Sequence, residues 1–238
     1  MKNNTEKYYA PIADPIILEL IRSHFPEVRR QQDSHAIHVT ADTVSGERIC
    51  TVLDLGCGSG GNAAYLKAAG FDVTGITINA EEAQATSSIC PVLVFDLTKG
   101  LPSEIKRKSF NIVLAAHLLE HIFYPEVLLK NIMDVCRDGL LIVIPNLLYW
   151  RNRMKMLFGI FEYADLGIMD YTHSRWYTLK TIQELLEKYG FVIASKTATG
   201  GVFPESFPLH RLLNKLLCKL FPGLFGFQFY IVATKSKV

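Results

Sequence analysis

The stretch from Thr51 to Asn62 constrains the fold of this chain more than any other part of it. It begins as an apolar run, continues into glycines and ends where a helical pattern starts, TVLDLGCGSGGN. This order is typical of a buried parallel strand that turns sharply into a helix, with backbone amides facing a ligand. Glycine is needed there because a Cβ atom would block the bend and the approach of a cofactor. Asp54 would place a carboxylate below the turn, where it suits a positively charged ligand and repels a pyrophosphate.

Strand-like and helical patterns alternate from residue 49 onward. Strands are predicted at 51–55, 72–76, 92–96, 110–115, 139–144, 191–197 and 229–234, and helices at 62–69, 80–88, 125–136 and 179–189. Apolar strands that alternate with helices predict a parallel sheet covered on both faces, which is a Rossmann-like, doubly wound α/β fold. Ligands of such sheets bind beyond the carboxyl ends of the strands.

Residues 1–238 are predicted to form a single domain with three additions to this alternating core. Residues 1–47 form an N-terminal helical extension, whose helix begins near Asp14 and Pro15 because Asp can cap a helix and Pro suits its first turn. Residues 146–175 form a cap insertion after the carboxyl end of a strand, which favours contacts with a substrate. Residues 200–227 form a second insertion.

Composition argues against several classes of protein. Hydrophobic residues make up 49% and charged residues 20%, which indicates a globular chain, and a net charge of +2 gives no case for nucleic-acid binding. The five cysteines form no CxxC pair, so neither a disulfide framework nor a metal site is predicted. No signal peptide and no run of roughly 18 apolar residues is found, so we expect no transmembrane segment. Cysteines in apolar stretches favour a reducing, cytoplasmic location.

Three of the glycines, Gly56, Gly58 and Gly61, also satisfy the GxGxxG pattern of dinucleotide sites. A nicotinamide dinucleotide would require an acid about 20 residues downstream, at the end of the second strand. Thr77 stands there instead, with no acid or Arg beside it. A nicotinamide-dependent oxidoreductase is therefore the alternative rather than the preferred interpretation. At the end of the third strand, Asp96 suits an exocyclic amine.

The segment from Ser109 to His121 adds a further strand with a Leu-Glu-His ending, SFNIVLAAHLLEH. Together with residues 54–60 and with Asp96-Leu97, it resembles the motifs of the class I S-adenosylmethionine-dependent methyltransferases. Residues 167–178 are similar to a subgroup of ubiquinone-type and polysaccharide or natural-product methyltransferases. The resemblance implies a seven-stranded sheet, mostly parallel with the last strand antiparallel, and S-adenosylmethionine as the cofactor.

The resemblance also implies roles for the residues of the first glycine-rich motif. Gly56 and Gly58 would line the methionine portion of the cofactor, with Cys57 as a small filler between them. Asp54 would help to hold the ammonium group, and His117 would lie beside the methionine end.

The ribose and the adenine would be held by the ends of the second and third strands. Thr77, followed by Ile78, departs from the usual acid that grips both ribose hydroxyls, and Glu82 is the candidate that shares the ribose instead. Asp96 would accept from the adenine amino group while Leu97 packs against the ring.

The sulfonium of the cofactor is already an activated leaving group, so transfer needs alignment and, for an alcohol, removal of a proton. His173 is the favoured base because it lies near Arg175 in the cap insertion, and His121 is the second candidate. An alternative is that Thr172, His173 and Arg175 form a hydrogen-bonded anchor for the cap. The resemblance points to O-methylation of a sugar, quinol or natural-product intermediate, with N- or C-methylation left open.

Three further features concern the partners of the protein. Tyr9 could belong to a lid over the cofactor or pack the first helix, and Arg151 could neutralise an acidic acceptor or simply face solvent. Tyr9, Arg151 and Arg175 are the candidates for substrate binding. Residues 209–221 are amphipathic and basic, which is compatible with peripheral membrane contact, with a helix covering the domain or with a dimer seam. We therefore expect a monomer or homodimer that acts on a small molecule.

Overall fold

A seven-stranded sheet forms the centre of the computed structural model, which describes residues 12–25 and 49–236. The strands are β1 (Thr51–Leu55), β2 (Asp72–Thr77), β3 (Val92–Val94), β4 (Phe110–Ala116), β5 (Cys136–Pro145), β6 (Phe191–Gly200) and β7 (Gly226–Lys235). Their order is β3-β2-β1-β4-β5-β7-β6. β7 alone runs antiparallel to its neighbours, which confirms the fold class inferred from the sequence.

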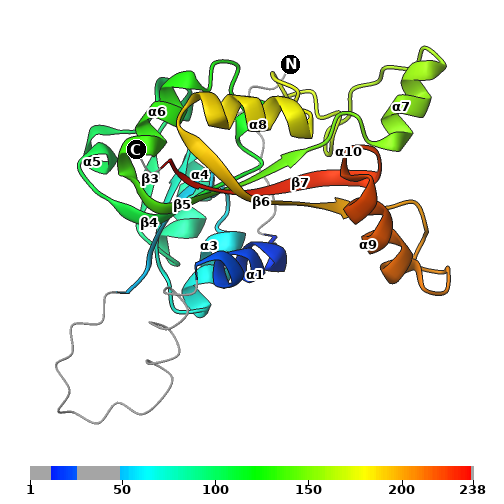
Figure 1. Cartoon of the computed structure of the whole chain (residues 1–238). Helices are drawn as coiled ribbons and strands as arrows, with labels where there is room; N and C mark the ends of the chain where they lie inside the picture. Colours follow the sequence, from blue (N-terminus) through cyan, green and yellow to red (C-terminus); the bar gives the residue numbers. More distant parts are fainter. Residues whose placement is uncertain (1–11, 26–48, 237–238) are drawn as a thin grey trace, which may run out of the picture.

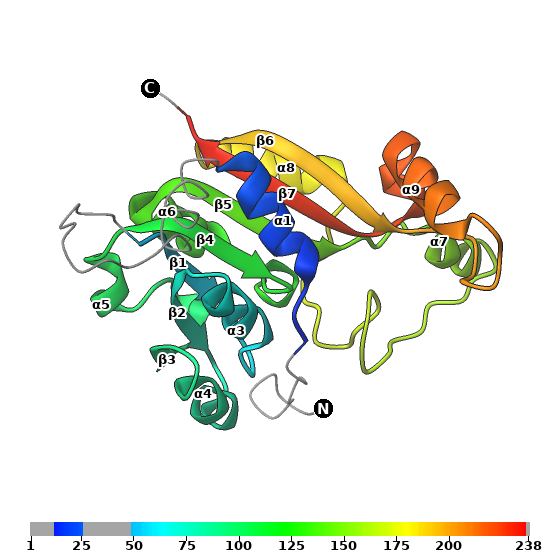
Figure 2. The ribbon, with the colours of Figure 1, turned by 90° about the horizontal axis from the view of Figure 1, so that it is seen from below.

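Helices cover both faces of this sheet. α1 (Pro15–His24) and α3 (Gly61–Ala68) lie on one face, and α6 (Glu126–Val135) and α8 (Leu179–Lys188) lie on the other (Figures 1 and 2). The remaining helices are α4 (Ala80–Ser87), α5 (Ser103–Lys106), α7 (Trp150–Leu157), α9 (His210–Leu220), α10 (Pro222–Phe225) and the short 3₁₀ helices η2 (Leu97–Lys99) and η3 (Leu119–His121). Within the described residues, no helix is both long and apolar enough to cross a membrane.

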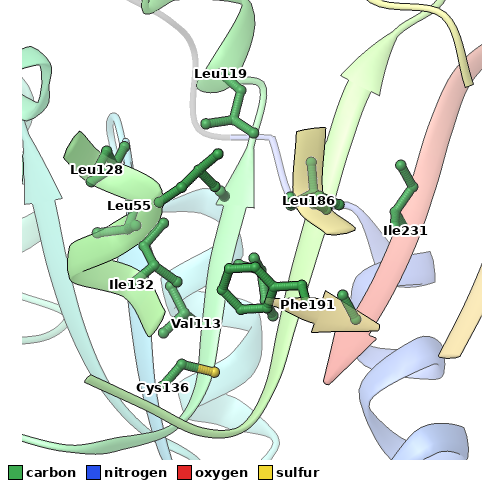
Figure 3. Packing of buried hydrophobic residues seen from close by; sticks show 14 of the residues in the cluster. Leu55, Val113, Leu119, Leu128, Ile132, Cys136, Leu186, Phe191 and Ile231 are labelled. Atoms are coloured by element: carbon green, nitrogen blue, oxygen red, sulfur yellow. The ribbon is translucent and has the colours of Figure 1, made fainter. Parts of the chain in front are cut away.

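Two hydrophobic clusters fill the spaces between the sheet and its helices. Successive residues of a strand point to opposite faces, so each strand serves both clusters. Val113 of β4 packs in the cluster under α6 and α8, whereas Leu114 packs in the cluster under α1 and α3. Figure 3 shows Ile132 and Leu186 meeting the sheet in the first of these clusters.

The structure differs from the predicted boundaries at several places. β5 begins at Cys136 rather than at residue 139, because Cys136 pairs with Phe110 at the start of β4. β7 begins at Gly226, inside the predicted second insertion, and α7 occupies part of the predicted cap. The N-terminal helix begins as predicted, since the Asp14 carboxylate accepts a hydrogen bond from the Ile16 amide at 3.1 Å.

Candidate active site

A cavity of about 390 Å³ opens at the carboxyl ends of β1, β2 and β4. The strand order reverses between β1 and β4, and this is where parallel α/β sheets bind ligands. The predicted site residues that line the cavity are Gly56, Cys57, Gly58, Thr77, Ile78, Glu82, Asp96, Leu97, His117, His121 and His173.

The glycine-rich turn after β1 forms one wall of this cavity. Gly56 and Gly58 have φ values of +73° and +51°, a region that residues with a Cβ atom rarely adopt. The amides of Gly56 and Cys57 donate to the Ile76 carbonyl at 2.8 and 2.9 Å, which ties the turn to β2. The Cys57 thiol is buried and its pKa is raised by burial, so it fills space rather than reacting.

Asp54 lies below this turn and is not part of the cavity lining. Its side chain is 2% exposed, and no atom of the described residues forms a hydrogen bond with its Oδ2. Burial raises the pKa of Asp54 from 3.8 to about 7. A cation placed near this buried carboxyl group would stabilise its ionised form.

A pair of buried polar side chains stands at the end of β2. The Thr77 hydroxyl donates to the Glu82 carboxylate at 2.8 Å, and both residues border the cavity. Glu82 is held in place because the Asn79 side chain caps α4 and accepts from the Glu82 amide at 3.3 Å. The first turn of the following helix thus places a carboxylate beside the end of β2, where the strand itself has no acid.

Asp96 and Leu97 follow β3 and border the cavity on another side. Asp96 caps η2 and accepts from the Thr98 amide at 3.0 Å and the Thr98 hydroxyl at 2.6 Å. Burial raises the pKa of Asp96, but these hydrogen bonds outweigh it, so the pKa lies below its ordinary value and the group is charged at neutral pH. Leu97 is buried beside it and offers an apolar surface to a flat ring.

His117 ends β4 with a φ of +53°, and its amide donates to the Val143 carbonyl at 2.8 Å. This strained backbone turns the side chain towards the cavity, where it is 49% exposed. Its Nδ1 lies 3.4 Å from Glu120 Oε1. Burial lowers the pKa of His117, and the Glu120 carboxylate raises it. The raising effect is the larger one, so the pKa of His117 lies above its ordinary value.

Glu120, His121 and His173 meet at a further part of the cavity. The segment before α8 is joined to η3 because the amides of Ser174 and Arg175 donate to the Glu120 carbonyl at 2.8 and 3.0 Å. The rings of His121 and His173 then pack edge to face, with their centroids 4.8 Å apart. Burial lowers the pKa of His121, which keeps that imidazole neutral.

Two of the predicted substrate-binding residues, Arg175 and Arg151, are not part of this lining. Arg175 instead donates to the Phe123 carbonyl at 3.0 Å and pairs with Glu126 at 3.4 Å. Arg151 lies over the Trp150 ring on α7, away from the cavity lining. Tyr9 lies outside the described residues.

Several lining residues were not predicted from the sequence. Ile12 and Phe227 come from opposite ends of the chain, and no local pattern relates them to the glycine turn. Phe95 precedes Asp96 at the end of β3, so its position at a strand end was an available signal. Glu120 of the Leu-Glu-His sequence is buried, and its place just after a buried strand and two leucines was another available signal, because a buried carboxylate is costly unless it is paired.

The family model for a methyltransferase domain matches residues 19–196 of the chain. This match covers well over half of the sequence and agrees with the strand order and with the cavity at the switch point. The chain belongs to this family, the class I S-adenosylmethionine-dependent methyltransferases. The family assignment speaks against the nicotinamide alternative.

Curated relatives are similar over part of their length. A 2-methyl-6-phytyl-1,4-hydroquinone methyltransferase from Synechocystis is 26% identical over 162 residues, which is 65% of this chain and 50% of that protein. A norajmaline N-methyltransferase from Rauvolfia serpentina is 30% identical over 100 residues, which is 39% of this chain and 34% of that protein. The chain thus matches half or less of the length of these relatives.

Solved structures share the fold over most of the chain. A methyltransferase from Archaeoglobus fulgidus matches with a TM-score of 0.57 and 19% identity, covering 93% of this chain and 100% of that one. A magnesium protoporphyrin IX methyltransferase from Synechocystis, solved with S-adenosylhomocysteine, matches with a TM-score of 0.53 and 15% identity, covering 96% and 90%.

Proposed function

We propose that the protein transfers a methyl group from S-adenosylmethionine to an oxygen of a small molecule such as a sugar, quinol or natural-product intermediate. The observation that carries this proposal is one cavity bordered both by the glycine turn and by the imidazoles of His121 and His173. The first feature suits the cofactor and the second suits a hydroxyl group that must lose its proton.

The proposed cofactor contacts follow from the chemistry of each wall. The ammonium of the methionine portion would lie above Asp54, and the ribose hydroxyls would bind the Glu82 carboxylate. The adenine amino group would donate to Asp96 while its ring packs on Leu97. His117 would stand beside the methionine end, at the boundary between cofactor and acceptor.

Methyl transfer then requires a deprotonated acceptor in line with the sulfur. The acceptor oxygen forms a bond to the methyl carbon while the carbon–sulfur bond breaks and its electron pair stays on sulfur. His173 and His121 are the groups near which the acceptor hydroxyl would lose its proton. Oxygen is preferred over nitrogen because this end of the cavity offers groups that can assist proton removal.

The curated relatives support a small-molecule acceptor without fixing the acceptor atom. One is named for a hydroquinone substrate and the other for N-methylation of an alkaloid. N- or C-methylation is therefore the second candidate.

Binding of the demethylated product tests the proposal directly. S-adenosylhomocysteine at about 100 times its Kd should stabilise the protein by about 2.7 kcal/mol and raise its Tm by about 5–10 °C. NAD or NADP at the same concentration should leave the Tm unchanged. A Tm that rises with the dinucleotides and not with S-adenosylhomocysteine would refute the proposed function.

We also propose that α9 makes peripheral contact with a membrane surface. Three of its leucines are exposed, and three basic residues precede them by one position each: Leu212, Leu216 and Leu220, with Arg211, Lys215 and Lys219. Cys218 is the one buried residue of this helix, so the three exposed leucines are not used to cover the domain. Such a helix fits the interface of an anionic bilayer.

A further inference from the structure

The Glu120 carboxylate is the least compensated charge bordering the cavity. Its side chain is 1% exposed, and within the described residues neither of its oxygens has a hydrogen-bond partner. The nearest basic atom is His117 Nδ1, 3.4 Å from Oε1, which is an ion-pair contact without hydrogen-bond geometry. A buried carboxylate is strongly unfavourable unless it is paired or binds a cation.

The imidazoles of His121 and His173 lie beside this carboxylate, and the Nδ1 atom of each ring forms a hydrogen bond with the protein. His173 Nδ1 lies 3.0 Å from the Ile168 carbonyl, which can only accept, so Nδ1 carries the proton. His121 Nδ1 lies 3.1 Å from the Thr172 hydroxyl, which already donates to Asp170 at 2.7 Å, so this Nδ1 also carries a proton. In both rings the Nε2 atom therefore keeps its lone pair.

We propose that Glu120, His121 and His173 bind a divalent first-row transition-metal ion at the acceptor end of the cavity. The potential ligand atoms of the three residues all lie within 4.8 Å of one another. Two ligands at about 2.1 Å from an ion lie no more than about 4.2 Å apart, and about 3.4 Å apart in a tetrahedral site, so the most distant pair must close by up to roughly 0.6–1.4 Å. Backbone and hydroxyl groups that hold Nδ1 of each histidine are the usual outer partners of metal-binding imidazoles.

The ligand set indicates which ion the site would take. Imidazole suits zinc, copper, iron and nickel, whereas calcium, magnesium and manganese prefer oxygen ligands. Three protein ligands leave at least one coordination position open towards the cavity, as in catalytic rather than structural sites. We expect Zn²⁺ to bind much more tightly than Mg²⁺.

The chemical role of the ion rests on the proposed function. The ion would narrow that function to acceptors that carry a hydroxyl group and bind the ion through its oxygen. Coordination lowers the pKa of the acceptor O–H group, and the proton leaves to water. The bound oxygen then attacks the methyl carbon, the carbon–sulfur bond breaks towards sulfur, and S-adenosylhomocysteine forms. His173 would act as a ligand, with the ion taking over the task of acidifying the acceptor.

Metal binding can be measured without knowing the acceptor. Tag-free protein treated with a chelator would be titrated with Zn²⁺ by calorimetry and with Co²⁺ by visible absorption. We expect one ion per chain and a Co²⁺ spectrum of nitrogen and oxygen ligation. Glu120→Gln, His121→Ala and His173→Ala should each weaken Zn²⁺ binding at least tenfold.

His210→Ala is the matched control, because the His210 Nδ1 also contacts a backbone carbonyl, that of Phe207 at 3.0 Å, but the residue lies on α9 and is absent from the cavity lining. It should leave Zn²⁺ affinity unchanged. Cooperative thermal unfolding of each variant without ligand shows that the fold is intact, and a separate measurement of S-adenosylhomocysteine binding keeps the two proposals apart. If Glu120→Gln fails to fold, the two histidine variants carry the test.

Unchanged Zn²⁺ affinity in folded variants, or absence of any binding to the wild type, would overturn the metal proposal even if S-adenosylhomocysteine binds. Zn²⁺ binding that depends on the three residues, in a protein that does not bind S-adenosylhomocysteine, would support the metal site and refute the proposed function.

Discussion

Asp54 couples the stability of the protein to pH because its ionised form is disfavoured in the folded state. Its pKa is about 7 in the fold against an ordinary value of 3.8. The folded state therefore binds a proton more tightly than the unfolded state, and stability falls as pH rises from about 4 to about 7. The full difference corresponds to about 4 kcal/mol, as an upper limit.

Replacing Asp54 with Asn should remove this dependence. We expect the free energy of unfolding of Asp54→Asn to exceed that of the wild type at about pH 8 and to approach it at about pH 4. Denaturant unfolding across this range measures the difference. Saturating S-adenosylhomocysteine should reduce the pH dependence of the wild type, because its ammonium would favour the charged carboxylate. An identical pH profile for both proteins would contradict the raised pKa.

Glu82 should carry much of the affinity for the cofactor. Loss of a charge-assisted hydrogen bond costs about 1.5–3 kcal/mol, so Glu82→Gln should weaken S-adenosylhomocysteine binding at least about tenfold in calorimetry. Glu81→Gln, its exposed neighbour on α4, is the control and should bind normally. Thr77→Asp should gain no affinity, because Glu82 already supplies the acid at this position. A tighter-binding Thr77→Asp variant would argue against that assignment.

At the scale of elements, α9 gives the clearest prediction. The protein should cosediment with anionic phospholipid vesicles, and added salt should weaken this binding because the lysines and arginine contribute. Leu212→Glu combined with Leu216→Glu should reduce vesicle binding at least tenfold, since each leucine that becomes buried in the membrane contributes roughly 1.5–3 kcal/mol.

Val127→Glu, a substitution of an exposed apolar residue on α6, is the matched control and should not change vesicle binding. Wild-type protein that ignores vesicles but dimerises through Leu212 and Leu216 in sedimentation velocity would identify α9 as a dimer seam instead.

The elements that the sequence predicted well are those with strong apolar runs. β1 was predicted with its observed bounds, and β2 and β4 to within one residue, because buried parallel strands are apolar throughout and end at polar or glycine residues. α7 was missed because none of its residues is buried, so it has no apolar stripe facing a core. The start of β5 was missed because Arg137 and Asp138 are exposed and interrupt the apolar pattern.

At the scale of the whole molecule, the cofactor side of the cavity was more predictable than the acceptor side. Gly56, Thr77 and Asp96 each follow a strand, so a local pattern is enough to bring them to one edge of the sheet. The meeting of Glu120 with His173 depends on how the segment before α8 docks on η3, and no local rule fixes that docking. A metal site was accordingly not predicted from the sequence, although all three proposed ligands are visible there.

A hydrogen bond beside the cavity joins Asp14, which caps α1, to Tyr230 of β7. The Tyr230 hydroxyl donates to the Asp14 carboxylate, and the Asp14 amide donates to the Asn62 side chain at 2.9 Å, next to the glycine turn. A growing polypeptide therefore cannot hold α1 in this position until β7 has left the ribosome. Chains truncated before β7 would lack both this hydrogen bond and Phe227, so synthesis of β7 is a precondition for a finished pocket.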